Sequence, residues 1–320
     1  MDFELTEDQR AFAEAASQFA KEQLAPTAAE WDEKQIFPTQ VLQQAGEMGF
    51  LSLYTPQERG GLGLGRLDAS IVFEQLAMGC TSTTAFMTIH NMVTWMIASF
   101  ATEDVKQQYC PKLTCGEWLG SYCLTEPNAG SDAASLTTTA VKQGDKYLLN
   151  GSKTFISGAG DTQVLVVMAR TQDSGAKGIS AFVVPADAQG ISYGRKEPKL
   201  GWNSQPTRSI TFENVEIPAN HLLGVEGQGF TFAMKGLDGG RINIATCSVG
   251  TAQQALNQAT QYVQERKQFG VTLSSFQGLQ HRCAHLFSEL ELVKSVVLKA
   301  LMALDEGDEY TSMLVSLAKA

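Results

Sequence analysis

The sequence predicts a multidomain α+β protein: an N-terminal α-helical bundle (1–117), a middle antiparallel β-barrel (118–224) and a C-terminal α-helical bundle (225–320). The spacing of apolar residues is helical in the first segment, alternates along the second and is helical again in the third. Several short strands without helices between them indicate a barrel or a sandwich. The length of 320 residues suits two or three domains, at roughly 150 residues each.

The N-terminal segment opens with a strong helix signal. Thr6 and Gln9 fit a capping box, and Phe12, Ala16 and Phe19 then recur on one face of the predicted helix. Further helices are expected to begin at 39 and 103 and to span 67–78 and 82–100.

The middle segment contains a short-range hairpin signal. Asn150-Gly151 separates the alternating runs 146–149 and 153–156, and Asn-Gly favours the positive φ angles of a type I′ turn. Further strands are expected at 164–169, 179–185 and 209–212.

The third segment is predicted to form helices at about 230–266, 275–305 and from 308 onward. The last pattern reaches Ala320 without a Gly, Asn or Pro to end it. An amphipathic helix that ends in mid-pattern leaves its bundle short of a partner. We therefore expect the C-terminal bundle to be incomplete in this sequence.

Composition narrows the class of protein. The 24 Lys and Arg against 34 Asp and Glu give a net charge of −10 without a basic cluster, which argues against general nucleic-acid binding. The six cysteines form no CxxC pair and indicate reduced thiols. The acidic N-terminus resembles neither a signal nor a transit peptide, and no run of about 18 apolar residues predicts membrane insertion. We expect a bacterial cytoplasmic protein, or alternatively a mitochondrial matrix protein after processing.

Three motifs suggest chemistry but have simpler explanations. The 61–65 run has the spacing GxGxG and follows no convincing βαβ strand, so a loop between helices is the better interpretation. The 151–154 run lacks the Gly-Lys pair of a phosphate-binding loop. His281 and His285 lie one helical turn apart with Cys283 between them, but further ligands are not evident, so no metal site is predicted.

The 122–132 segment differs from these motifs. It leaves a predicted strand and enters a loop broken by Pro127 and Gly130 and rich in small hydrogen-bonding groups. Such groups suit a flat heteroaromatic ligand with several donors and acceptors in one plane. The same residues would also suit an ordinary loop with an Asx or Ser turn.

The run 123–135 resembles the first signature of the acyl-CoA dehydrogenases, and the resemblance continues in order along the chain. The other matching segments are 56–63, 150–157, 212–218, 236–242 and 265–270. A helical, β and helical order is also that family's architecture. The segments 79–85, 89–91, 201–208 and 239–245 are most similar to members that act on a short branched acyl-CoA of the isobutyryl type, in valine breakdown.

This resemblance implies FAD as the cofactor, with the flavin between the β domain and the second helical domain. Thr125 would lie near the pyrimidine edge and Ser157 near N5. The residues implied to hold FAD are Tyr122, Cys123, Leu124, Thr125, Ser131, Phe155, Ile156, Ser157, Arg266, Phe269, Phe276 and Gln277. Those implied to contact the acyl-CoA are Ser131, Asp238, Gly239, Gly240 and Arg241.

The resemblance also implies partners. Arg266, Phe276 and Gln277 would reach the FAD of a neighbouring subunit, which implies a homo-oligomer, usually a tetramer built as a dimer of dimers. An Arg suits the pyrophosphate because its planar fork can donate two hydrogen bonds. A small electron-transferring flavoprotein would accept the electrons.

The implied reaction is an α,β-dehydrogenation in which a carboxylate removes the α proton. Burial would raise the pKa of that base toward neutrality. The family's usual Glu is expected beyond Ala320, and a second position used by some members is Gly240 here, which cannot serve. Glu126, Asp132 and Glu213 are expected to have other roles. The alternatives are a non-catalytic binding relative, a dehydrogenase with another chain preference, and a flavin oxidase or monooxygenase.

Overall fold

In the computed structural model, which describes residues 4–320, the chain forms two units. Among the described residues, the helical unit contains 4–26, Gly65–Ala85 and Arg241–Ala320, and the sheet unit contains Thr27–Leu64 and Phe86–Gly240. Met1, Asp2 and Phe3, which begin the acidic N-terminus, lie outside the described residues. The predicted order of helical, β and helical segments is confirmed, whereas the boundaries after 117 and 224 stay predictions.

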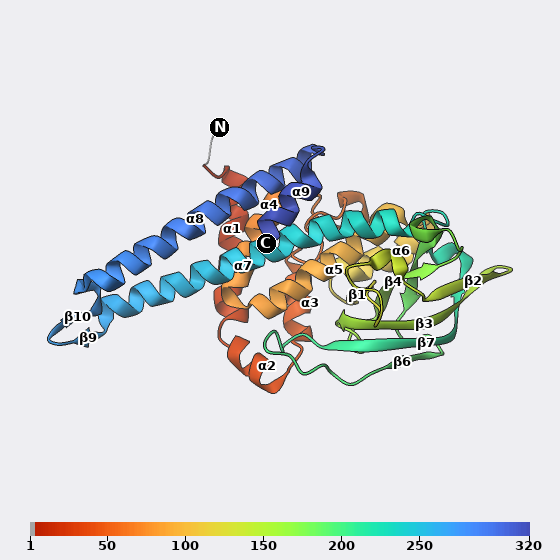
Figure 1. Cartoon of the computed structure of the whole chain (residues 1–320), viewed down its shortest axis with the longest axis horizontal. Helices are drawn as coiled ribbons and strands as arrows, with labels where there is room; N and C mark the ends of the chain where they lie inside the picture. The colour runs from red at the N-terminus through yellow and green to blue at the C-terminus, as the bar shows by residue number, and fades with distance from the viewer. Residues whose placement is uncertain (1–3) are drawn as a thin grey trace. The chain divides into compact units, whose positions relative to one another are not determined.

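The helical unit has an apolar core where three helices meet. Ile242 and Val249 of α7, Val297 and Leu301 of α8, and Leu314 of α9 belong to one buried cluster. Figure 1 shows α8 running back along the second half of α7, with the short strands β9 and β10 between them in the chain. The elements are α1 (Glu7–Phe19), a π-helical turn (Ala20–Leu24), α4 (Arg66–Gly79), α7 (Gly229–Glu265, whose residues up to Gly240 belong to the sheet unit), β9 (Lys267–Gln268), β10 (Val271–Thr272), α8 (Gln277–Glu306) and α9 (Thr311–Lys319).

The helix ends of this unit follow the expected chemistry. The capping box of Thr6 and Gln9 is present at the start of α1. Gly65, at the N-cap of α4, has no side chain to offer, and Asp305 of α8 accepts from the N–H groups of Arg66 (2.7 Å) and Leu67 (3.0 Å) instead. The glycine-rich run 61–65 is therefore a loop that leads into a helix, as predicted.

The sheet unit is built on one mixed sheet. Its strand order is β6-β7-β3-β2-β4-β5-β8, with β1 paired parallel to β4. The remaining described pairings are antiparallel apart from one parallel bridge between β2 and β4. The strands are β1 (Gly120–Cys123), β2 (Thr139–Gln143), β3 (Lys146–Ser157), β4 (Val164–Arg170), β5 (Ile179–Pro185), β6 (Ile191–Tyr193), β7 (Thr207–Pro218) and β8 (Leu222–Leu223). The expected purely antiparallel pairing is thus wrong for β1, because β2 and β3 intervene before the chain returns as β4.

The predicted hairpin at Asn150-Gly151 is also wrong. Strand β3 runs straight through these residues, and its register against β7 shifts between Leu149 and Gly151. Gly151 has a φ of +143°, and a Cβ there would lie 2.6 Å from the Thr138 Oγ1 atom. The glycine therefore serves a bulge and a close approach. The hairpin turn lies at Gly144-Asp145, between β2 and β3.

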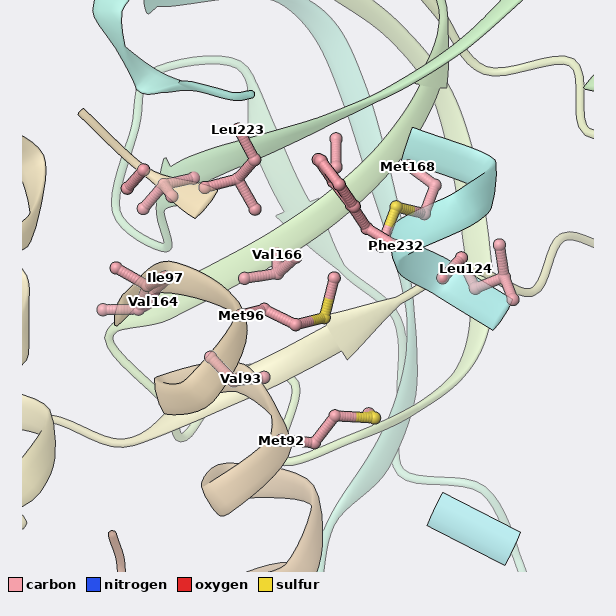
Figure 2. Packing of buried hydrophobic residues seen from close by; sticks show 14 of the residues in the cluster. Met92, Val93, Met96, Ile97, Leu124, Val164, Val166, Met168, Leu223 and Phe232 are labelled. Carbon is pink, nitrogen blue, oxygen red and sulfur yellow. The ribbon is translucent and has the colours of Figure 1, made fainter. Parts of the chain in front are cut away.

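Both faces of the sheet are covered. Along β4, Val164, Val166 and Met168 lie in one buried cluster, and Leu165 and Val167 lie in another. Figure 2 shows the first cluster, in which the β4 side chains meet Met92 and Met96 of α5 and Phe232 of α7. The helices of this unit are α2 (Ala28–Lys34), α3 (Thr39–Glu47), α5 (Thr81–Phe100, from Phe86 onward), α6 (Glu103–Thr114) and α7 up to Gly240. Within residues 4–320, no helix is both long and apolar enough to span a membrane.

Helix α5 fixes its neighbours through buried polar side chains. The His90 Nδ1 atom accepts from the Gly120 N–H at 3.1 Å, and Nε2 lies 2.9 Å from the Leu113 carbonyl oxygen. The Asn91 amide donates to the Phe50 carbonyl and accepts from the Leu53 N–H, each at 2.8 Å. Because His90 positions the first residue of β1, it also positions the loop that follows that strand.

Burial of neutral His90 predicts an acid-dependent loss of stability. Burial lowers the pKa of His90 from 6.5 to about 4. The unfolded chain therefore takes up a proton before the folded chain does, and the free energy of unfolding should fall by up to about 3 kcal/mol as pH drops from 6.5 to about 4. The free energy of unfolding of His90→Gln, measured with urea across this range, should depend less on pH than that of the wild type. The exposed control His281→Gln should keep the wild-type dependence; equal slopes in all three proteins would contradict the assignment.

Candidate functional site

The loop after β1 is held by its own backbone and by β3. Glu126 and Ala129 exchange two backbone hydrogen bonds, of 3.0 and 3.1 Å, around Pro127-Asn128. The Thr154 N–H of β3 donates to the Thr125 carbonyl oxygen at 2.9 Å. The segment rich in hydrogen-bonding groups is therefore a closed turn that is fastened to the neighbouring strand.

A buried ion pair secures the same loop. Lys153 Nζ lies 2.7 Å from Glu126 Oε1, with side chains 0% and 4% exposed, and it also donates to the Leu124 carbonyl oxygen at 3.1 Å. The Glu126 carboxylate accepts further from the N–H and hydroxyl of Thr137, at 2.7 and 2.9 Å, and from the Thr138 N–H at 3.0 Å. Glu126 thus fixes the loop.

The charges of this pair are set by their surroundings. Burial alone would raise the pKa of Glu126, but the charge and hydrogen bond of Lys153, together with the Thr137 and Thr138 donors, outweigh burial and lower that pKa to about 2. Burial lowers the pKa of Lys153, and Glu126 offsets part of that effect. With four donors converging on the carboxylate, the pair is ionised at neutral pH.

Strand β3 presents an aromatic side chain beside this loop. Phe155 has a φ of +56° and is 64% exposed, and the register of β3 against β7 shifts between Lys153 and Ile156. A bulge in which a non-glycine residue takes the left-handed conformation is a strained feature of the kind that marks functional sites. Beyond it, Ile156 is buried and the Ser157 carbonyl oxygen accepts from the Ser121 hydroxyl at 2.7 Å.

The groups of this site that lack partners suit a flat polar ligand. The Tyr122 hydroxyl is buried without a hydrogen-bond partner, and the Thr125 N–H donates to no acceptor among residues 4–320. Together with exposed Phe155, they supply an aromatic surface and free donors on neighbouring strand ends. These residues fit an isoalloxazine ring, which offers an apolar face and a hydrogen-bonding edge.

Of the other predicted site residues in the sheet unit, some are buried and some are accessible to a ligand. Cys123 is fully buried in the core under the loop, and burial raises the pKa of its thiol to about 12. Ser131 is exposed, and Asp238 and Gly240 are half-buried on α7. A Cβ at Gly240 would meet no atom within 4 Å, so the helix backbone is accessible there.

The predicted residues of the helical unit gather at the turn between α7 and α8. Phe269 is 92% exposed with a φ of +53°, and its ring centroid lies 6.2 Å from that of Phe276. Arg266 and Gln277 are exposed as well, and Arg266 has no acidic partner in the described part of the chain. The structure thus brings together Arg266, Phe269, Phe276 and Gln277 as one exposed group.

One functional residue was missed from the sequence. Lys153 lies in an alternating strand at a position of the same parity as Tyr147 and Leu149, which are both buried. An inward-facing Lys in such a pattern signals a buried acidic partner, here Glu126. Among residues 4–320, no three His, Cys, Asp or Glu side chains are grouped as they would be in a metal site.

Comparisons with known proteins identify the family. The model of the acyl-CoA dehydrogenase N-terminal domain matches residues 6–117, that of the middle domain 121–215, and that of the C-terminal domain 227–320. Mitochondrial isobutyryl-CoA dehydrogenase of Bos taurus is 49% identical over 315 residues, and that of Dictyostelium discoideum is 47% identical over 316 residues. Each alignment covers 98% of this chain and 76% of the relative.

The solved structure of butyryl-CoA dehydrogenase from Megasphaera elsdenii is also similar. It matches with a TM-score of 0.94 and 35% identity over 99% of this chain and 84% of that chain. The site therefore belongs to a flavoprotein oxidoreductase with FAD as its cofactor. This chain belongs to the acyl-CoA dehydrogenase family.

The buried pair predicts a large effect of a single substitution. Lys153→Met should lower the free energy of unfolding by about 3–5 kcal/mol, because it leaves the Glu126 carboxylate buried without its cation. Chemical denaturation of the purified variant measures this loss. Lys142→Met, which removes an exposed Lys of β2, is the matched control and should change stability by no more than about 0.5 kcal/mol. Equal effects of the two substitutions would refute a stabilising role for the pair.

Proposed function

We propose that this protein catalyses the FAD-dependent α,β-dehydrogenation of a short branched acyl-CoA of the isobutyryl type, in valine breakdown. The observation that carries the proposal is identity of 47–49% along almost the whole chain to two isobutyryl-CoA dehydrogenases. The closed loop beside Phe155, with its free donors, supports the placement of the flavin.

Different residues would bind the cofactor and the substrate. Tyr122, Leu124 and Thr125 would hold the polar edge of the isoalloxazine, and Phe155 would cover its ring. FAD, when bound, supplies the acceptor for the β hydrogen, which leaves as hydride. Ser131 and the run 238–241 would hold the acyl-CoA, with the accessible backbone at Gly240 allowing its thioester arm to approach closely.

The α proton needs a base that these residues do not provide. A thioester α proton is a weak acid, so the base must be a desolvated carboxylate and the enolate-like oxygen must receive hydrogen bonds. We assign this role to a Glu that follows Ala320 in the full-length protein. The share of the relatives that the chain covers, 76%, leaves room for such a residue.

The proposed assembly is a homotetramer built as a dimer of dimers. In it, the exposed group of Arg266, Phe269, Phe276 and Gln277 would complete the FAD site of a neighbouring subunit. Large exposed apolar side chains on α8 and α9 support self-association; they include Phe287, Leu292, Val293, Met313 and Leu317. The electron acceptor would be an electron-transferring flavoprotein, and the location a bacterial cytoplasm or a mitochondrial matrix.

The substrate assignment predicts a spectroscopic result. The purified full-length protein should be yellow, and isobutyryl-CoA should bleach the flavin absorbance under anaerobic conditions. Straight-chain butyryl-CoA should bleach it more slowly, because a pocket shaped for the branched chain holds the straight chain less well. Stopped-flow absorbance with a panel of CoA thioesters measures these rates.

The same experiment separates the alternatives. A yellow protein that no acyl-CoA bleaches would favour a non-catalytic binding relative, and rapid reoxidation by oxygen would favour an oxidase or a monooxygenase. Faster bleaching by a straight-chain thioester would favour another chain preference. If one Glu is the base, its change to Gln should abolish bleaching and leave FAD bound.

The proposed subunit interface predicts a coupled loss. Arg266→Ala should reduce both the FAD content and the association of subunits, because one guanidinium would serve the cofactor and the interface. Absorbance of the purified variant and its elution in size-exclusion chromatography measure the two effects. Arg282→Ala, which removes an exposed Arg of α8, serves as the control. Unchanged FAD content in Arg266→Ala would contradict the cross-subunit role.

A further inference from the structure

The ammonium of Lys153 lies behind one particular peptide group of the loop. It donates to the Leu124 carbonyl oxygen at 3.1 Å, and that carbonyl shares its peptide group with the Thr125 N–H. The bond is trans, as are all the peptide bonds that the structure describes. The C=O and N–H of a trans peptide point in opposite directions. The Thr125 N–H therefore points away from Lys153.

The Thr125 N–H is a free donor beside backbone and side-chain groups that are occupied. The Thr125 carbonyl oxygen accepts from Thr154, and the Glu126 N–H donates to Ala129. The Glu126 carboxylate is taken by Lys153, Thr137 and Thr138. Among residues 4–320, the Thr125 N–H donates to no acceptor. The fold thus leaves this donor for a ligand.

A cation at one end of a peptide group strengthens the donor at its other end. A hydrogen bond from an ammonium polarises the carbonyl, and polarisation passes along connected hydrogen-bonding groups. The effect is large here because the Lys153 side chain is buried and water does not screen it.

We propose that Lys153 is a positioning residue that tunes the flavin through the Leu124–Thr125 peptide: its ammonium holds that peptide in place and strengthens the Thr125 N–H as a donor to the pyrimidine edge of FAD. This inference rests on the proposed function, which places that edge against the loop. Reduction adds negative charge to the edge, so a stronger donor favours reduced FAD. Glu126 opposes this effect. Its carboxylate is paired with the same ammonium, and its negative charge weakens the field of that cation at the peptide.

The two members of the pair should therefore act with opposite signs. The double variant Lys153→Met with Glu126→Gln replaces the pair by neutral side chains of similar size, which such a site can accept. At a fixed potential, its ratio of reduced to oxidised FAD should fall about ten-fold, which is about 30 mV for a two-electron couple. Glu126→Gln alone leaves Lys153 on the Leu124 carbonyl without the opposing carboxylate charge, and its ratio should rise.

The measurement is an anaerobic reductive titration of the FAD-loaded, full-length protein with dithionite against an indicator dye. It reports the potential without catalysis. Lys142→Met is the matched control, because it removes the same charge from an exposed position of β2 and should leave the potential unchanged. Shifts of the same sign in the double and single variants would mean that the pair only maintains the shape of the loop.

The remaining outcomes also decide the inference. An unchanged potential in the double variant would overturn it. If the double variant does not fold, the sign of the shift in Glu126→Gln decides alone. A wild-type protein that takes up no FAD overturns both the proposed function and this inference. A wild-type protein that isobutyryl-CoA bleaches, with variants that shift as the control does, overturns this inference alone.

Discussion

The site depends on one desolvated charge pair. Lys153 and Glu126 come from β3 and from the loop after β1, and neither can leave the other without exposing a buried charge to an apolar core. A loop that contains Pro127 and Gly130 would otherwise be mobile. The pair converts this loop into a rigid part of the sheet, because it also engages the backbone at Leu124, Thr137 and Thr138.

The strain at Phe155 is supported by the same arrangement. A bulky residue in the left-handed conformation costs of order 1–3 kcal/mol and persists only where its surroundings enforce it. Here Lys153 is anchored by its ion pair, Thr154 by its bond to Thr125, and Ile156 by its pairing with Arg208 of β7. The backbone conformation at Phe155 is therefore constrained. The Phe155 side chain is held outside the core, beside the loop.

Periodicity predicted most of the architecture because it reports which face is buried. The changes of period located the β segment, and the predicted 230–266 helix agrees with α7 within a residue at each end. Local turn chemistry failed at Asn150-Gly151, because the approach of Thr138 required a glycine inside a continuous strand. The parallel pairing of β1 could not be predicted either, since it depends on a contact with β4 some 40 residues later, from Gly120 to Val164. The role of Lys153 was not predicted, because a charged side chain in a strand usually faces solvent and the sequence does not show its buried acidic partner.

The environments of Glu126, Asp132 and Glu213 make each of them a poor candidate for the general base. A base for a weak carbon acid needs a carboxylate whose pKa is raised by desolvation. Glu126 is desolvated, yet Lys153 and the threonine donors hold its pKa low, so it is a poor proton acceptor at neutral pH. Asp132 and Glu213 are exposed, so neither has the desolvated environment that a base needs. Burial with a cation and exposure to water are the two common environments of acidic side chains, and both keep a carboxylate ionised. A catalytic carboxylate requires the third environment, burial without a cation, which is the environment we expect around the proposed Glu.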